Sequence, residues 1–286
     1  MKIGFLFPGQ GSQFVGMGKE LYEKDEDARK IYDRVKEITG IDIAQISFEG
    51  PDEVLNQTKY TQLAILTNSL AELKVLEKQG IKADISAGLS LGEYSALIYS
   101  KALSFEDGVK LVQKRGEFMQ DLAPSGDWQM AAILGASDED VENLCKRVKC
   151  GFVVPVNYNC PGQVVVTGDK VGVCNLQELA KDVGIKKIRV LNTSGPFHTC
   201  KLEESSNALR RELEKVKFHN FESTVIKNID GEPYTCEDNI EEILAKHIVS
   251  PVRFSKCLKK MKELGVDEFI EVGPGKTLSG FVKRMF

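Results

Sequence analysis

Long apolar runs, paired metal-binding motifs and an excess of one charge are all missing from this 286-residue sequence. No apolar stretch approaches the ~20 residues that a membrane helix needs, so we expect no membrane association. The three histidines and seven cysteines form no C-x-x-C or other metal-like spacing, and we expect no metal site. A formal net charge of -4 argues against broad nucleic-acid binding.

A secretion signal is also missing from the start of the chain. The apolar stretch within residues 1–7 is too short for a signal-peptide core and is followed directly by a proline and glycine loop. An odd number of cysteines without such a signal is typical of reduced thiols, so we expect a cytoplasmic protein. The hydrophobic fraction of 42% is ordinary for a globular chain that buries one large core or two smaller ones.

Short apolar segments alternate with longer amphipathic segments in the first 120 residues, which predicts an α/β domain with a mostly parallel sheet. The predicted strands are residues 2–7 and 83–87. The predicted helices are residues 14–22, 28–39, 61–79, 91–100 and 105–121.

The rhythm changes after the turn-forming residues 123–127. The following segments read strand, helix, strand, strand, helix, strand, which is the βαββαβ order of ferredoxin-like folds. The predicted segments are residues 129–134, 137–148, 152–158, 163–167, 169–183 and 186–191. The first pattern then resumes, with helices at 201–215, 240–247 and 255–264 and strands at 224–228 and 268–272.

These segments predict one discontinuous α/β domain, residues 1–124 and 194–286, interrupted by a ferredoxin-like subdomain, residues 125–193. Ligand sites in such proteins usually lie in the crevice at the carboxyl ends of the strands. We therefore look for chemistry in the loops that follow the predicted strands.

The sequence Gly88-Leu89-Ser90-Leu91-Gly92 matches the G-x-S-x-G nucleophile elbow, in which a serine lies on a tight turn between a strand and a helix. The glycines fit because side chains at those positions would collide with the neighbouring strand and helix. The alternative is a glycine-bounded turn whose serine only caps a helix. The five residues alone do not separate these two interpretations.

A serine nucleophile needs a base, and the candidates are His198, His219 and His247. His198 lies in a Gly- and Pro-containing loop between a predicted strand and helix, where catalytic residues collect. His219 reads as a surface or packing residue, and His247 as a helix-terminal residue. For the oxyanion, the backbone N–H of Leu91 is one expected donor, and the glycine-rich loop 7–13 offers a second.

Five segments occur together in one order: residues 7–13 (FPGQGSQ), 88–95 (GLSLGEYS), 115–119 (RGEFM), 196–198 (PFH) and 271–276 (EVGPGK). With them the chain resembles the malonyl-CoA:acyl carrier protein transacylases of fatty-acid synthesis and the related acyltransferase domains of polyketide synthases. The resemblance runs from the first strand almost to the last residue. It implies an α/β-hydrolase-like domain with a ferredoxin-like subdomain over the cleft.

The resemblance implies that Ser90 takes a malonyl group from coenzyme A as an ester and passes it to the phosphopantetheine thiol of the carrier. His198 would be the base, the backbone N–H groups of Gln10 and Leu91 would hold the oxyanion, and the main-chain carbonyl at His247 would orient His198. No bound cofactor is implied, because the coenzyme A thioester is itself the substrate.

Two residues would set substrate choice. The resemblance implies that Arg115 binds the malonyl carboxylate, a role that suits a bidentate guanidinium. Phe197 is the residue found in malonyl-selective relatives, and its ring would crowd an α-methyl group. The alternative for Arg115 is an ordinary surface arginine.

The chain departs from the commonest family pattern in three places. Leu89 replaces a frequent histidine, His247 stands where glutamine is usual, and Trp128 lies in a run that is normally smaller. Trp128 would either narrow the mouth of the cleft or cover the subdomain.

Acyl carrier proteins are acidic, so we expect a transient partner of that kind and no nucleic acid or membrane. Basic residues near the predicted cleft would steer the carrier, the alternative being ordinary solvated charge. These residues are Lys186, Lys187, Arg189, Lys201, Arg210 and Arg211.

Two other functions stay open for the sequence. A serine hydrolase such as a thioesterase would use the same dyad, and a non-catalytic carrier-binding module would use neither Ser90 nor His198.

Overall fold

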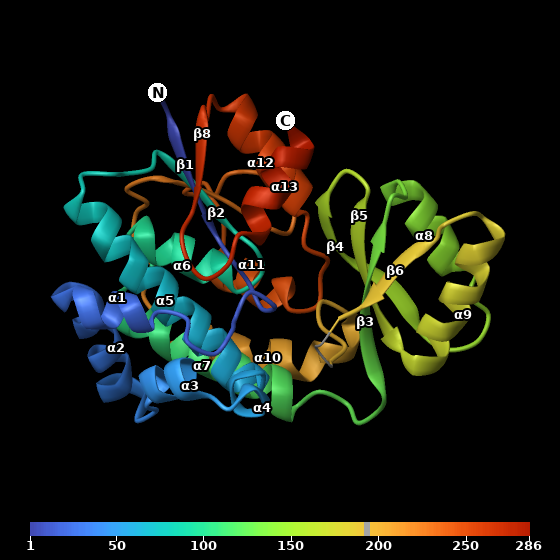
Figure 1. Ribbon diagram of the computed structural model, residues 1–286, viewed down its shortest axis with the longest axis horizontal. Helices are drawn as coiled ribbons and strands as arrows, with labels where there is room; N and C mark the ends of the chain where they lie inside the picture. Colours follow the sequence, from blue (N-terminus) through green and yellow to red (C-terminus); the bar gives the residue numbers. More distant parts are fainter. Residues whose placement is uncertain (192–194) are drawn as a thin grey trace.

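The computed structural model describes residues 1–191 and 195–286 and places two β-sheets beside each other. The larger unit, which holds both chain termini, surrounds a parallel sheet, and the smaller unit surrounds an antiparallel sheet (Figure 1). The α/β class and the change of architecture expected from the sequence are both confirmed. No helix among the described residues is long and apolar enough to cross a membrane.

The parallel sheet has the strand order β7-β2-β1-β8, and every neighbouring pair in it is parallel. Its strands are β1 (Ile3–Phe7), β2 (Ile85–Gly88), β7 (Thr224–Ile226) and β8 (Glu268–Glu271). Strands β1 and β2 lie at its centre and are buried, so the loops that leave their carboxyl ends meet at one edge. Those loops carry the glycine-rich segment and the predicted elbow.

Helices cover both faces of the parallel sheet, and the pleat of β1 separates their two cores. Phe5 and Phe7 point into the larger core, and Leu6 points into the smaller one. The smaller core is formed largely by α12 (Phe254–Glu263) and α13 (Thr277–Met285). The remaining helices of this unit are α1 (Lys19–Lys24), α2 (Glu26–Thr39), α3 (Ile43–Glu49), α4 (Asp52–Leu55), α5 (Thr58–Lys78), α6 (Gly92–Tyr99), α7 (Phe105–Asp121), α10 (Glu203–Leu213) and α11 (Ile240–His247).

The antiparallel sheet has the order β4-β5-β3-β6, the arrangement expected for a βαββαβ unit. Its strands are β3 (Trp128–Leu134), β4 (Val153–Cys160), β5 (Gln163–Asp169) and β6 (Lys187–Val190). One face packs against α8 (Asp138–Arg147) and α9 (Lys170–Asp182), as Figure 1 shows. Alternate residues of the same strands point the other way, toward the larger unit.

The two units are joined along β4. The backbone N–H of Val252 donates to the carbonyl oxygen of Val156 at 2.8 Å, and the N–H of Tyr158 donates to the carbonyl oxygen of Val252 at 2.9 Å. A segment of the larger unit thus pairs with a strand of the smaller one. We propose that the units correspond to residues 1–124 with 194–286 and to residues 125–193; the boundary at 193/194 lies outside the described residues.

The helix predicted over residues 14–22 is wrong at its start, because α1 begins only at Lys19. Gly16 and Gly18 adopt φ values of 97° and 78°, which a right-handed helix cannot include. The sequence reading also missed α3, α4 and α13. Two of these are helices of four and seven residues, too short for a periodic pattern to stand out.

Candidate active site

The nucleophile elbow is present, with Ser90 between the end of β2 and the start of α6. Ser90 has a φ of 54°, which is strained for a residue that carries a side chain. A Cβ on Gly88 would lie 1.8 Å from the carbonyl carbon of Gly92, and one on Gly92 would lie 2.1 Å from the carbonyl oxygen of Phe7. Both glycines are therefore required by the turn, and a plain capping serine would not need them.

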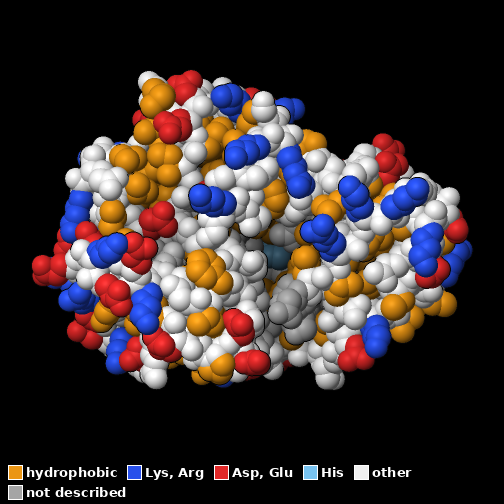
Figure 2. Space-filling view, in the orientation of Figure 1, with side chains coloured by type: hydrophobic (Ala, Val, Ile, Leu, Met, Phe, Trp, Pro, Cys, Tyr) orange, Lys and Arg blue, Asp and Glu red, His pale blue; other side chains and the backbone are white. Residues whose placement is uncertain are grey.

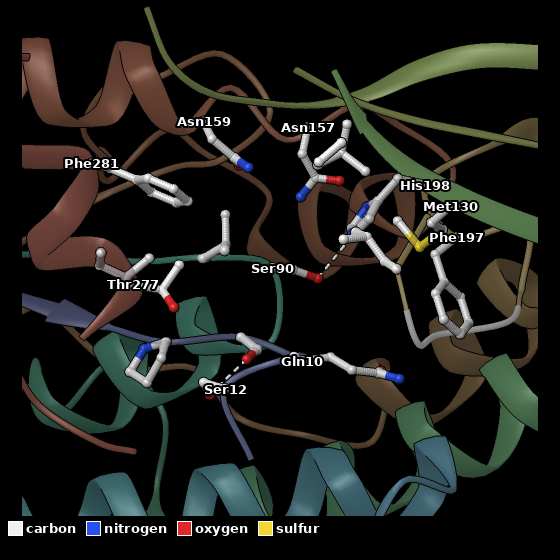
Figure 3. A pocket seen from close by; sticks show the side chains of 18 of the residues that line it. Gln10, Ser12, Ser90, Met130, Asn157, Asn159, Phe197, His198, Thr277 and Phe281 are labelled. Atoms are coloured by element: carbon white, nitrogen blue, oxygen red, sulfur yellow. Dashed lines mark hydrogen bonds between the residues drawn. The ribbon is translucent and has the colours of Figure 1, made fainter. Parts of the chain in front are cut away.

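His198 lies against Ser90, with 2.8 Å between its Nε2 and the Ser90 Oγ (Figure 3). Its Nδ1 faces two main-chain carbonyl oxygens, those of His247 at 3.0 Å and Ser250 at 3.1 Å. Because carbonyl oxygens only accept, Nδ1 carries the proton and Nε2 is left to accept the proton of the Ser90 hydroxyl. The predicted pair of serine and histidine, and the carbonyl at His247, are brought together.

His198 is buried, and burial together with the nearby Arg115 cation lowers its pKa from 6.5 to about 4. An imidazole with this pKa is neutral at pH 7, which is the form that accepts a proton. Among residues 1–191 and 195–286 no carboxylate contacts its Nδ1, so main-chain oxygens do the orienting that an aspartate does in a catalytic triad.

Arg115 is buried inside the site, which rules out the surface alternative. Its Nη2 donates to the Ser90 Oγ at 3.0 Å and its Nη1 donates to the Gln62 Oε1 at 2.7 Å. No carboxylate lies within ion-pair distance of it in the described part of the chain. Burial lowers the pKa of this guanidinium, and a ligand carboxylate would supply the missing counter-charge.

The main-chain N–H groups of Gln10 and Leu91 have no hydrogen-bond partner among residues 1–191 and 195–286. Gln10 lines the cleft beside Ser90, and its side chain is held away by a bond from Nε2 to the Thr58 Oγ1 at 3.2 Å. Two unpaired N–H groups, one next to Ser90 in the chain and one on a loop that lines the same cleft, suit an oxyanion hole.

A cleft of about 220 Å³ opens above Ser90 and His198, between the two units. Figure 3 shows Asn157 and Asn159 reaching into it from β4, and Met130 beside Phe197. The Oδ1 atoms of Asn157 and Asn159 are buried and accept no hydrogen bond from any described residue. The cleft is otherwise mostly apolar, so the side chains of Asn157 and Asn159 are the polar groups that β4 contributes to its wall.

The sequence reading missed four polar residues of the site: Gln62, Asn157, Asn159 and Asn228. Asn157 and Asn159 did leave a signal, because two asparagines at i and i+2 in a strand share one face. Asn228 left none, since it reaches the elbow from β7 through tertiary structure alone: its Oδ1 accepts from the Ser90 N–H at 2.7 Å.

The other singled-out residues are placed as follows. His219 is exposed and outside the cleft. Leu89 lines the cleft and packs with the smaller core, so an apolar contact replaces a polar one. Trp128 covers the subdomain: its Nε1 donates to the Pro124 carbonyl at 2.7 Å and its ring meets Phe152 edge-on.

Basic side chains lie along the upper and right-hand rim of the hollow between the units, at whose base a histidine is visible (Figure 2). Lys186, Lys187, Arg189, Lys201 and Arg211 are exposed, whereas Arg210 is paired with Glu242. The Lys201 Nζ also lies 5.1 Å from the centre of the Phe152 ring. No cluster of His, Cys, Asp and Glu suited to a metal occurs among the described residues.

This geometry suits nucleophilic acyl transfer: a serine on an elbow, a neutral histidine, two N–H donors and a buried cation. The family model described as an acyl transferase domain matches residues 4–286. The malonyl CoA-acyl carrier protein transacylase of Bacillus subtilis (strain 168) is 43% identical over 286 residues, which are 99% of this chain and 90% of that protein.

Solved structures agree with these matches. The crystal structure of malonyl CoA-acyl carrier protein transacylase from Clostridium perfringens ATCC 13124 has a TM-score of 0.95 and 45% identity, covering 100% of this chain and 90% of that one. A structure of a type II PKS acyl-carrier protein in complex with its malonyl-transacylase has a TM-score of 0.95 and 33% identity, covering 100% and 93%.

Proposed function

The chain belongs to the acyl transferase domain family, within which we propose that Ser90 carries the acyl group and His198 moves the proton. Its reaction is the transfer of a malonyl group from malonyl-CoA to an acyl carrier protein, in support of fatty-acid synthesis. The observation that carries the residue assignment is the Ser90–His198 contact of 2.8 Å beside a buried arginine.

In the first half-reaction, the Ser90 Oγ attacks the thioester carbonyl of malonyl-CoA while His198 Nε2 accepts the hydroxyl proton. The backbone N–H groups of Gln10 and Leu91 stabilise the oxyanion, each worth roughly 3 kcal/mol of barrier if they behave as other oxyanion donors do. Collapse breaks the carbon–sulfur bond, and His198 returns the proton to the departing thiolate. The product is a malonyl ester on Ser90.

In the second half-reaction, the phosphopantetheine thiol of the carrier replaces coenzyme A. His198 accepts the thiol proton, and the thiolate attacks the ester carbonyl. Breaking the ester bond returns the proton from His198 to the Ser90 oxygen. The same N–H groups hold both tetrahedral intermediates, because the two steps are the reverse of each other in chemistry.

Arg115 binds the carboxylate of the malonyl group. Its guanidinium is fixed by Gln62 and already touches the Ser90 Oγ, so a carboxylate two carbons beyond the reacting carbonyl carbon lies within its reach. An acetyl group would leave the buried cation unpaired, which disfavours it. The Phe197 ring, buried at the cleft wall, would crowd an α-methyl substituent and favour malonyl over methylmalonyl.

Asn157 and Asn159 bind the amides of the pantetheine arm, which coenzyme A and the carrier share. Both side chains line the cleft, and each carboxamide offers an N–H donor and a carbonyl acceptor to the pantetheine amides. The exposed basic residues at the rim receive the acidic carrier for the short time that transfer needs. A cytoplasmic location suits the seven cysteines, none of which forms a disulfide.

Mass spectrometry after mixing the protein with malonyl-CoA tests the residue assignment. We expect a malonyl adduct on Ser90 in the wild type and none in Ser90→Ala. An adduct that persists in Ser90→Ala would overturn the assignment. Rapid release of free malonate without any carrier would instead indicate a hydrolase.

A further inference from the structure

Glu93 is a buried carboxyl group one helical turn after Ser90, and the reaction described above does not use it. It is 1% exposed at the start of α6. Its Oε1 accepts from the Tyr234 hydroxyl at 2.5 Å, and its Oε2 accepts from the Asn228 backbone N–H at 3.1 Å. The same Oε2 lies 3.6 Å from the Nδ1 of His247. Burying a carboxyl group is costly, so these contacts call for an explanation.

One set of contacts leads from Glu93 to the nucleophile. Asn228, whose backbone Glu93 holds, is fully buried. Its Oδ1 accepts from the Ser90 N–H at 2.7 Å, and its Nδ2 donates to the Gly88 carbonyl oxygen at 2.6 Å. Asn228 is therefore hydrogen-bonded to the strained turn at two points, Gly88 and Ser90.

A second set of contacts leads to the base. The carbonyl oxygen of His247 accepts from His198 Nδ1, and the two imidazole rings lie 5.1 Å apart. The His247 ring is buried, and its Nε2 has no hydrogen-bond partner among the described residues. The Glu93 Oε2, 3.6 Å from the Nδ1 of this ring, is too far for a hydrogen bond but close enough for an electrostatic contact with it.

We propose that Glu93 is a positioning residue that fixes both members of the dyad, Ser90 through Asn228 and His198 through His247. This proposal rests on the function assigned above to Ser90 and His198. Rates of enzymatic steps are sensitive to such placement, since a displacement of ~1 Å costs on the order of 100-fold. A residue of this kind changes kcat and leaves substrate binding unchanged.

The test compares Glu93→Ala with Glu93→Gln, because glutamine keeps an oxygen that accepts from Asn228 and an amide that Tyr234 or His247 can bind. We expect Glu93→Ala to lower kcat about 10- to 100-fold with the KM for malonyl-CoA within about twofold, by loss of placement. Glu93→Gln should restore kcat to within about threefold of the wild type on the same argument.

Glu72→Ala is the matched control. Glu72 is a carboxyl group that is only partly buried, and burial raises its pKa to about 7; it accepts from the Gly273 N–H and does not touch the dyad or Asn228. The same measurements should leave its kcat within about twofold of the wild type, since placement is untouched. Equal losses of kcat in Glu93→Ala and Glu72→Ala, or no loss in Glu93→Ala, would overturn the proposal.

Tyr234→Phe keeps the proposal testable should Glu93→Ala fail to fold. It removes only the hydroxyl that holds the Glu93 Oε1, and we expect a drop in kcat of a few-fold, about 3- to 10-fold, with KM unchanged. The NMR resonance of the His198 Nδ1 proton should shift as the base moves. A normal kcat and an unshifted resonance in Tyr234→Phe would reject the proposal for Glu93. The roles of Ser90 and His198 would still stand if the wild type forms the malonyl-Ser90 adduct.

Discussion

The two units that face the cleft differ in whether the polar side chains of the site have hydrogen-bond partners within the protein. In the parallel-sheet unit, Ser90, His198 and Arg115 each have at least two hydrogen-bond partners and are fixed before a ligand arrives. In the antiparallel unit, the Oδ1 atoms of Asn157 and Asn159 are buried and have no described partner. We propose that the first unit supplies the reacting groups and the carboxylate-binding Arg115, and that the second unit binds the rest of the ligand, because bond-making needs fixed geometry.

The backbone reflects the same difference. Among the described residues, three that are not glycine have a positive φ: Ser90, Lys101 and His198. Two of these are the proposed dyad, and both belong to the parallel-sheet unit. Strain of this kind persists only where the surrounding contacts over-determine it. The strand β4 has no residue with a positive φ, although its pairing with β5 is irregular between Pro155 and Asn157 and between Tyr158 and Cys160.

The largest expected effect lies in the parallel-sheet unit, at Arg115. Arg115→Ala should lower the ratio of malonyl to acetyl transfer by at least about 100-fold, because the guanidinium proposed to bind the malonyl carboxylate is lost. Parallel assays of transfer from malonyl-CoA and acetyl-CoA measure that ratio. An unchanged ratio would show that Arg115 does not select the substrate.

The pH dependence of ester formation tests the lowered pKa of His198. Its lowered pKa of about 4 means that the neutral base persists well below pH 6.5, so malonyl-Ser90 formation should fall only near pH 4. At pH 5 an ordinary histidine of pKa 6.5 would be about 30-fold less available as a base. Rapid-quench mass spectrometry between about pH 3.5 and 7.5 covers both pKa values and gives the profile.

A fall centred near pH 6.5 would show that burial does not hold His198 neutral. Arg115→Ala is the informative comparison, because removing the cation should move the acid limb upward. The same shift acts on stability. The unfolded chain binds a proton at His198 below pH 6.5 and the folded chain does not until about pH 4, so stability falls as the pH drops through that window.

Substitutions in the antiparallel unit should act on binding instead. Asn157→Ala and Asn159→Ala should each raise the KM for malonyl-CoA about 5- to 10-fold with kcat nearly unchanged, because one ligand hydrogen bond is lost. Steady-state kinetics with Asn143→Ala, on the far helix α8, provides the control. A loss confined to kcat would mean that the smaller unit also positions reacting groups, and the contrast between the units would disappear.

The smallest effects should come from the charged rim. Lys187→Glu and Lys201→Glu should raise the KM for the carrier about 2- to 5-fold and weaken its dependence on salt, because rim charges act mainly on encounter. Transfer kinetics at several ionic strengths measure both, with Lys283→Glu on α13 as a control of equal charge change. Unchanged salt dependence would assign the carrier contact to other residues.

The sequence predicted most of the architecture because strand alternation, helix periodicity and turn residues are local properties. The elbow, the βαββαβ order and the loop that carries His198 could all be located in this way. The start of α1 and the short helices α3 and α4 could not, because glycine conformation and tertiary packing decide them. The five short segments that resemble a known family predicted which residues form the site. They did not predict which other residues contact them.

By itself the sequence determined that Ser90 lies between two glycines, and a tight turn there requires both, because a Cβ at Gly88 or Gly92 would collide with neighbouring backbone. Tertiary structure alone decided which groups surround it. The Ser90 N–H meets Asn228 across 138 positions of the chain, and the Ser90 Oγ meets His198 across 108. Arg115 became a buried cation only when α5 and α7 packed together. The physical reason is that turns are specified by neighbouring residues, whereas burial and charge depend on contacts that form only in the folded chain.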